Sequence, residues 1–400
     1  MSNAFTKLLM LSPQEKKQKG VEFTPAEIYQ QPMMWRKTFD ILEQNKSGIK
    51  KFLKGQEDRT ILLTGAGTSA FIGLALEPLF NKISGFNAKA VGTTEIITDP
   101  DAYFRPGKKY IVIHFARSGN SPESVGTFVL AEESKANIKH IVITCNKNGK
   151  LAKMGAGKKA LIVLLPPETD DKSLAMTSSF SSMVVAGQYI AALKKGGYKR
   201  IVGNLAVAAQ HVMDNSGNDL AKICSKKFTR AVFMGSNTLF GCAKECHLKL
   251  QEETDGQVVA KFDTFLGLRH GPEAVIDKRT LVVYLLSEEP LTRIYELDMM
   301  RGIKSKKIGQ TRLAFCRKAD KNIRNLSDVI VEYGEDIPDD YLTPVGVLIG
   351  QMLGVLRSLS QGLKPDSPSA AGVISRVVQG VKIYDRPRFY KKGKLKIIAG

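Results

Sequence analysis

The stretch Ile61-Leu-Leu-Thr-Gly-Ala-Gly-Thr-Ser69 is an apolar run that ends in a loop of small and polar residues. A second stretch of this kind, Ile111-Val-Ile-His-Phe-Ala-Arg-Ser-Gly-Asn-Ser121, lies further along the chain, and a helical pattern follows each loop. Short apolar runs that alternate with helical segments are typical of a buried parallel sheet covered by helices. We therefore expect an α/β fold with a doubly wound, mostly parallel sheet flanked by helices.

The same pattern occurs a second time in the chain. Ala231-Val-Phe-Met-Gly-Ser-Asn237 and Leu281-Val-Val-Tyr-Leu-Leu-Ser287 follow the first two stretches at a common offset of 170 positions. A shared offset at two separate strands predicts two tandem copies of one βαβ domain. We expect a helical lead-in over residues 1–55, a first domain over 56–200, a second domain over 201–385 and a basic tail over 386–400. The end of the tail around Lys391 is expected to be solvated and frayed.

Composition excludes several classes of protein. The net charge of +20 comes from 59 basic and 39 acidic residues, and the basic residues are scattered, so it predicts no nucleic-acid partner. The most apolar stretch, residues 183–193, is too short to span a bilayer. Five cysteines and no signal peptide fit a cytoplasmic protein without disulfides. Cys242, Cys246 and His247 could hold a metal, but cysteines one helical turn apart are more often core residues, so we expect no metal site.

The loop after the strand at Ile111 has the properties of an anion site. Ser121 can cap a helix that starts at Pro122, which leaves backbone N–H groups and the positive end of the helix facing an incoming anion. The loop at Gly67 follows the neighbouring strand, and ligands of open parallel sheets bind at the carboxyl ends of the strands. Either loop alone could be an ordinary βα turn. Together they predict a phosphorylated small molecule, because the spacing of a nucleotide-binding loop is missing.

The second copy carries different side chains in the corresponding loop. Glu288 and Glu289 occupy the positions of Ser118 and Gly119, and two carboxylates would repel a phosphate there. Elsewhere the second copy offers acid–base chemistry. His270 lies in a loop bounded by Gly and Pro, where an imidazole can exchange protons near neutral pH. Either Glu252 or Glu253, at the end of a helix, could act as a carboxylate base.

These motifs together resemble a known family. The family that they resemble is the sugar isomerase (SIS) domain family, and the segments that carry the resemblance are Gly65-Ala-Gly-Thr-Ser-Ala-Phe71, Ala116-Arg-Ser-Gly-Asn-Ser-Pro-Glu-Ser124, Ala175-Met-Thr-Ser-Ser179 and Leu268-Arg-His-Gly-Pro272. More narrowly, the chain resembles the tagatose-6-phosphate ketose/aldose isomerase group, also described as galactosamine-6-phosphate deaminase/isomerase, over roughly residues 22–385. The family has tandem α/β sugar-phosphate domains, so the resemblance implies two tandem SIS domains.

The resemblance also implies roles for individual residues. It favours Glu252 over Glu253 as the residue that moves a proton between C1 and C2 of the sugar, and it makes His270 the residue that assists ring opening. Family members usually pair into dimers, and in related enzymes this histidine comes from the partner subunit, so a homodimer with shared active sites is expected. The substrate-binding residues that we expect are Gly67, Thr68, Ser69, Arg117, Ser118, Gly119, Asn120, Ser121, Thr177 and Ser178.

The resulting hypothesis is an aldose–ketose isomerase and deaminase acting on hexose or amino-hexose 6-phosphates, with no cofactor. The expected reaction turns galactosamine 6-phosphate into tagatose 6-phosphate plus ammonia, through an enediol or enolamine intermediate. The alternative is a regulatory protein that binds a sugar phosphate without chemistry.

Overall fold

The computed structural model describes residues 2–158, 160–376, 378, 380–384 and 397–400. The first half of the chain forms a parallel five-stranded sheet in the order β2-β1-β3-β4-β5. Its strands are β1 (Thr60–Gly65), β2 (Asn87–Gly92), β3 (Lys109–Ala116), β4 (Asn137–Thr144) and β5 (Leu161–Leu164). The helices of this half are α6 (Thr68–Leu79), the π-helix η1 (Phe80–Ser84), α7 (Thr93–Thr98), α8 (Pro100–Tyr103), α9 (Pro122–Glu132), α10 (Lys150–Gly157), η2 (Pro167–Thr169) and α11 (Ser178–Ala192).

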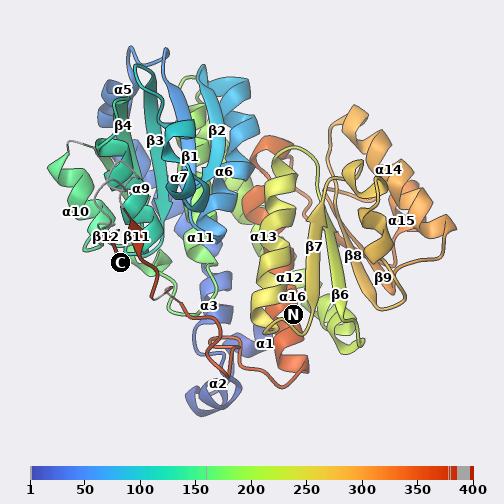
Figure 1. Ribbon diagram of the computed structural model, residues 1–400. Helices are drawn as coiled ribbons and strands as arrows, with labels where there is room; N and C mark the ends of the chain where they lie inside the picture. The colour runs from blue at the N-terminus through green and yellow to red at the C-terminus, as the bar shows by residue number, and fades with distance from the viewer. Residues whose placement is uncertain (1, 159, 377, 379, 385–396) are drawn as a thin grey trace.

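The second half repeats this arrangement (Figure 1). Its parallel sheet has the order β7-β6-β8-β9-β10, which is the order of the first sheet with each strand replaced by its counterpart. The strands are β6 (Arg230–Met234), β7 (Val259–Asp263), β8 (Thr280–Leu285), β9 (Thr311–Cys316) and β10 (Val329–Glu332). The helices are α13 (Thr238–Glu253), η3 (Gly267–Arg269), η4 (Pro272–Val275), α14 (Pro290–Ser305), α15 (Lys321–Leu326), η5 (Asp339–Tyr341) and α16 (Thr343–Ser360).

The pairing of the strands confirms the repeat read from the sequence. Ile61 pairs with Ile111 in the first sheet, and Ala231 pairs with Leu281 in the second, so both members of a pair are displaced by the same 170 positions. The backbone repeats as well. Gly67 has φ 56° and ψ −128°, and Asn237, at the same offset, has φ 54° and ψ −123°. The predicted fold class, tandem parallel α/β domains, is therefore confirmed.

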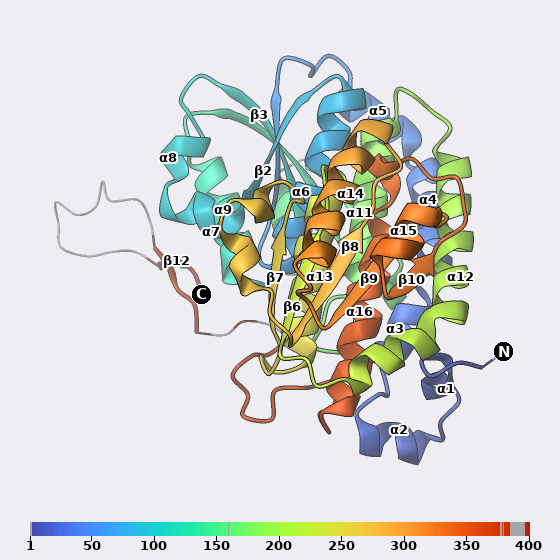
Figure 2. The same cartoon turned by 90° about the vertical axis from the view of Figure 1, so that its right-hand side faces the viewer.

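The two halves share one hydrophobic core. A single buried cluster extends from Ile61 and Ile111 in the first sheet to Leu281 and Leu313 in the second. Helices α11 and α16 lie between the sheets and are buried on nearly every side, as expected of helices that are apolar all round. The long helix α12 (Tyr198–Ser225) joins the halves and packs along α16 and α4 (Figure 2).

The lead-in and the C-terminal segment complete the fold. The segment before β1 consists of α1 (Thr6–Leu9), α2 (Pro13–Lys19), α3 (Thr24–Tyr29), α4 (Gln31–Gln44) and α5 (Lys46–Leu53). Near the C-terminus β11 (Ile383–Tyr384) pairs with β12 (Ile397–Ala399). The predicted frayed end around Lys391 lies outside the described residues. Within the described part of the chain, no helix is both long and apolar enough to cross a membrane.

Candidate functional site

The two loops singled out in the sequence line one cavity of about 210 Å³, which we call the loop cavity. The loop after β1 and the loop after β3 lie at the carboxyl ends of neighbouring strands. Of the predicted substrate-binding residues, the structure brings these together at the loop cavity: Gly67, Ser69, Arg117, Ser118, Gly119 and Ser121. Thr94, Glu123, Ser124 and Met176 add to the walls of the loop cavity.

The loop after β3 leaves hydrogen-bond donors free for an anion. Helix α9 starts at Pro122, and Ser121 makes no capping hydrogen bond to the helix backbone. Instead the Ser121 hydroxyl donates to Ser124 Oγ at 2.8 Å. Among the described residues, no group accepts a hydrogen bond from the backbone N–H of Ser118 or Gly119. Free N–H groups at a helix N-terminus are a ready-made anion site.

Charged side chains of both signs surround the loop cavity. The buried guanidinium of Arg117 donates to the carbonyl oxygens of Leu174 and Arg376 at 3.2 and 2.6 Å. Arg376 also lines the cavity, and its guanidinium is held by Asp170 at 2.7 Å. Against these two cations stands Glu123, whose buried Oε2 has no hydrogen-bond partner among the described residues. Because Asp170 pairs with Arg376 and Glu123 faces the cavity, these charges nearly cancel, and the free N–H groups of the loop after β3 are the feature that favours an anion.

Four of the predicted binding residues lie outside the loop cavity. Thr68 lines an adjoining cavity, described below, and Asn120, Thr177 and Ser178 line neither of the two cavities. Asn120 is exposed and lines a different hollow, and its side-chain oxygen accepts from the backbone N–H of Lys150 at 3.0 Å. Thr177 and Ser178 are buried at the start of α11, where their N–H groups donate to the buried carboxylate of Asp171 at 2.8 and 3.1 Å. The N–H groups at the N-terminus of α11 need acceptors, and Asp171 provides them. The backbone N–H groups of Thr177 and Ser178 are therefore not free for a ligand. Their roles in substrate binding stay predictions.

The corresponding loop of the second half is filled by the protein's own carboxylates. The backbone N–H of Glu288 donates to Asp339 Oδ1 at 2.9 Å, and that of Glu289 donates to Ser287 Oγ at 3.1 Å. The backbone N–H of Ser287 donates to Glu296 Oε2 at 2.9 Å. Burial raises the pKa of Glu296 to about 8. The donors that lie free in the first half therefore have internal partners in the second half, and the expectation that the second loop does not bind phosphate stays a prediction.

A second cavity of about 590 Å³ adjoins the first, and we call it the Glu252 cavity. The two cavities share Ala66, Arg117, Met176, Arg376 and Val378 as wall residues. The Glu252 cavity is lined by residues of both halves, because Thr68 comes from the first half and Lys249 and Glu252 come from the second. None of these three residues lines the loop cavity.

Glu252 and Glu253, the two candidates for the carboxylate base, differ in their surroundings. Glu252 faces the Glu252 cavity, with about a quarter of its side chain exposed. Glu253 is buried on the opposite side, and burial raises its pKa well above the usual range. Only Glu252 is placed to meet a ligand in the Glu252 cavity.

Lys249 is a site residue that the sequence reading missed. Its side chain is 1% exposed, yet the ammonium contacts Glu252, Thr68 Oγ1 at 3.2 Å and Glu245 Oε1 at 3.4 Å. Burial alone would lower the pKa of Lys249, but the two carboxylates outweigh it and raise the pKa. The spacing of Glu245, Lys249 and Glu252 puts all three on one face of α13, which is the signal that could have found them.

The C-terminal segment was also missed as part of the site. Gly372, Val373, Ile374 and Ser375 form one wall of the Glu252 cavity, and Arg376 is wall to both cavities. Arg376 Nε fixes this wall by donating to the carbonyl of Asp171 at 2.7 Å. Contacts between residues some 200 positions apart leave no local pattern in the sequence.

His270 does not line either cavity. It lies exposed in the turn between η3 and η4, next to the exposed Arg269. The two cysteines considered for a metal, Cys242 and Cys246, are buried against the backbone carbonyls of Thr343 and Gly346. No cluster of three potential metal ligands occurs among the residues that the structure describes.

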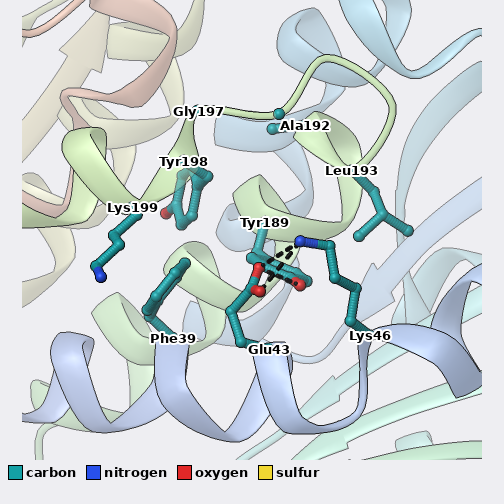
Figure 3. Close-up of a pocket in the computed structure, with 10 residues that line it drawn as sticks. Phe39, Glu43, Lys46, Tyr189, Ala192, Leu193, Gly197, Tyr198 and Lys199 are labelled. Carbon is teal, nitrogen blue, oxygen red and sulfur yellow. Dashed lines mark hydrogen bonds and ion pairs between the residues drawn. The ribbon is translucent and has the colours of Figure 1, made fainter.

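A separate hollow of about 190 Å³ lies between α4 and α11, away from the predicted site residues (Figure 3). Phe39, Tyr189 and Tyr198 form its aromatic wall. Glu43 accepts hydrogen bonds from Tyr189 at 2.8 Å and from Lys46 at 3.0 Å. Three polar groups of this hollow, those of Glu43, Lys46 and Tyr189, are thus paired with one another.

Comparison with known proteins agrees with this geometry. A model of the SIS domain matches residues 56–193. The D-galactosamine-6-phosphate deaminase AgaS of Shewanella sp. (strain ANA-3) is 34% identical over 383 residues, which cover 94% of this chain and 95% of that protein. The chain belongs to the SIS-domain family, in the AgaS group.

Solved structures of the AgaS group have the same fold. The tagatose-6-phosphate ketose/aldose isomerase of Escherichia coli superimposes with a TM-score of 0.80 at 32% identity, covering 88% of this chain and 96% of that chain. A Clostridium novyi NT protein, provisionally assigned the same activity, superimposes with a TM-score of 0.89 at 34% identity and covers 96% of this chain and 100% of its own.

Proposed function

We propose that this SIS-domain chain is an isomerase and deaminase of amino-hexose 6-phosphates, and that it converts galactosamine 6-phosphate to tagatose 6-phosphate and ammonia. One observation carries the proposal. The free N–H groups of the loop after β3 and the carboxylate of Glu252 line two cavities that share Arg117, Met176 and Arg376 as walls. A sugar phosphate bound across both would have its phosphate at one end and C1 and C2 near a base at the other.

The chemistry follows from this placement. The loop cavity holds the phosphate, which fixes the sugar chain by its far end. Once the ring is open, Glu252 removes the proton from C2 and returns it to C1, so that an enolamine becomes an imine at C2. Lys249, against Glu252, is placed to donate to the oxygen on C1 as charge develops there. Water then adds to C2 and ammonia leaves, which yields the ketose.

Ring opening is assigned to His270 of the partner subunit. Within one chain His270 is exposed and lines neither cavity. A homodimer that brings this imidazole to the open side of the Glu252 cavity would complete the site. A dimer in which His270 stays in solvent would contradict this part of the proposal.

A panel of hexosamine and hexose 6-phosphates, scored for both ketose and ammonia, tests the function. We expect both products from galactosamine 6-phosphate, in equal amounts. If a hexose 6-phosphate gives ketose and no substrate gives ammonia, the protein is an isomerase and the proposed deamination is wrong. Tight binding of galactosamine 6-phosphate with no product would favour the regulatory sugar-phosphate binder instead. The presence of Lys249 and Glu252 in a ligand-sized cavity favours the enzyme over the regulatory binder.

A further inference from the structure

Glu245 is a fully buried carboxyl group that the proposed reaction does not use. It lies on α13, one turn before Lys249, and none of its surface is exposed. Its Oε1 accepts a hydrogen bond from the hydroxyl of Thr68 at 3.4 Å and lies 3.4 Å from the ammonium of Lys249. Its Oε2 has no partner among the described residues. Glu245 lines neither cavity, so it cannot touch a ligand in them.

Stability does not explain this carboxyl group. Replacing buried ionic groups by apolar side chains of similar size is often neutral or stabilising, because desolvation of the charges offsets their attraction. A leucine at position 245 would fill the space between α6 and α13 without an unpaired oxygen. The group that Glu245 does act on is Lys249, whose ammonium has neighbours on two sides. Glu252 and Thr68 lie toward the Glu252 cavity, and Glu245 lies on the buried side of the ammonium.

We propose that Glu245 is a positioning residue, which together with Thr68 holds the ammonium of Lys249 in the place where it meets Glu252 and the reacting oxygen of the sugar. A lysine side chain has four rotatable bonds, so one contact to Glu252 does not fix its ammonium. The contacts to Glu245 and Thr68 give the ammonium two further fixed points. This inference rests on the proposed function, since it concerns the same acid–base pair.

The protonation state of Glu245 gives the arrangement a pH dependence. Burial raises the pKa of Glu245 to about 8, and the ammonium of Lys249 opposes this rise. The charged groups that act on Glu245 are Lys249 and Glu252 of its own helix, and α6 contributes only the neutral hydroxyl of Thr68. At pH 7 Glu245 is thus mostly neutral and Lys249 pairs with Glu252. Above pH 8 an ionised Glu245 competes with Glu252 for the ammonium.

Two substitutions separate these effects. In Glu245→Gln the oxygen acceptor stays but cannot ionise, so kcat at pH 7 should stay within about threefold of the wild type, and the decline of kcat above pH 8 should disappear. In Glu245→Leu the ammonium loses its support, and kcat should fall about 10²-fold with little change in KM, as for a misplaced catalytic group. Glu253→Gln is the matched control, because Glu253 is almost equally buried on α13 and neither of its carboxyl oxygens has a hydrogen-bond partner in the described structure.

Crystal structures of both variants test the inference without knowledge of the substrate, because they show directly where the ammonium of Lys249 lies. In Glu245→Leu we expect the ammonium of Lys249 to move away from Glu252, whether or not the sugar tested is turned over. An unmoved ammonium would overturn the inference even in an active enzyme, and so would an unchanged alkaline limb in Glu245→Gln. A wild type without activity on any sugar phosphate, but with the ammonium displaced in Glu245→Leu, would overturn only the proposed function.

Discussion

The ammonium of Lys249 donates a hydrogen bond of 3.2 Å to the hydroxyl of Thr68, and this contact joins the two halves of the repeat. Thr68 follows β1 and begins α6, beside the loop cavity. Lys249 lies on α13, which occupies the same position in the second half as α6 in the first. The anion loops of one copy and the acid–base residues of the other are therefore held together by a direct side-chain contact.

Glu252→Gln should lower kcat by about 10³-fold, because the proposed proton transfer needs a carboxylate base. Binding of galactosamine 6-phosphate should persist, since the phosphate is held in the loop cavity. Calorimetric binding and an ammonia assay on the same protein measure the two effects. Glu253→Gln serves as the control and should keep its activity. An active Glu252→Gln enzyme would remove the proposed base.

Ser121→Ala should weaken binding of sugar phosphates about tenfold, because a hydrogen bond to a charged group contributes about 1.5–3 kcal/mol. Affinity for the same sugar without its phosphate should not change. Ser287→Ala, in the corresponding loop of the second half, is the matched control and should leave both affinities unchanged. Equal affinity for sugar phosphates in Ser121→Ala and the wild type would count against the anion site.

Asp339→Ala should lower the free energy of unfolding by about 2 kcal/mol, because it leaves buried donors near the start of α14 without partners. Asp339 accepts from the backbone N–H of Glu288 and from the hydroxyl of Ser287. Chemical denaturation of Asp339→Ala and Asp339→Asn measures the effect, and the asparagine variant should lose less. Loss of sugar-phosphate affinity without loss of stability would place a ligand in the second half and contradict the asymmetry.

Glu27→Gln should flatten the dependence of stability on pH. Burial, with the nearby Asp171, raises the pKa of Glu27 from 4.5 to about 7. A carboxyl group whose pKa is higher in the folded than in the unfolded state stabilises the fold at low pH, and this contribution is lost as the pH rises through the pKa of the folded state. The wild type should thus lose stability between pH 5 and 8, and Glu27→Gln should retain about 2 kcal/mol more at pH 8.5. If the melting temperatures of the wild type and of Glu27→Gln change in parallel across this pH range, Glu27 is not the cause of the pH dependence of stability.

The elements that could be predicted from the sequence are those with local signals. The Gly-Thr-Ser loop at Gly67 and the loop before Pro122 follow strands whose apolar runs are continuous, so both the sheet and the position of the loops were visible. Strand β7 was missed because Val259, Lys261 and Asp263 are partly exposed along an edge strand, and an edge strand lacks a continuous apolar run.

The site residues that escaped prediction depend on contacts between distant segments. The helical spacing of Lys249 with Glu245 and Glu252 is visible in the sequence, but its contact with Thr68 depends on α6, and Arg376 becomes recognisable only when its guanidinium reaches Asp170. The same dependence on packing applies to Thr177 and Ser178, whose roles in substrate binding stay predictions. Thr177 and Ser178 have hydroxyl groups suited to a sugar, but the buried Asp171, six and seven positions earlier, binds their backbone N–H groups. A sequence motif identifies suitable chemistry, and the packing around it decides which partner each group meets.

A crystal structure with galactosamine 6-phosphate bound to the Glu252→Gln variant tests the central claim most directly. We expect the phosphate against the N–H groups of Ser118 and Gly119, and C1 and C2 within hydrogen-bonding reach of residue 252 and Lys249. A phosphate in the loop between β8 and α14, or a sugar in the hollow lined by Tyr189, would contradict the account.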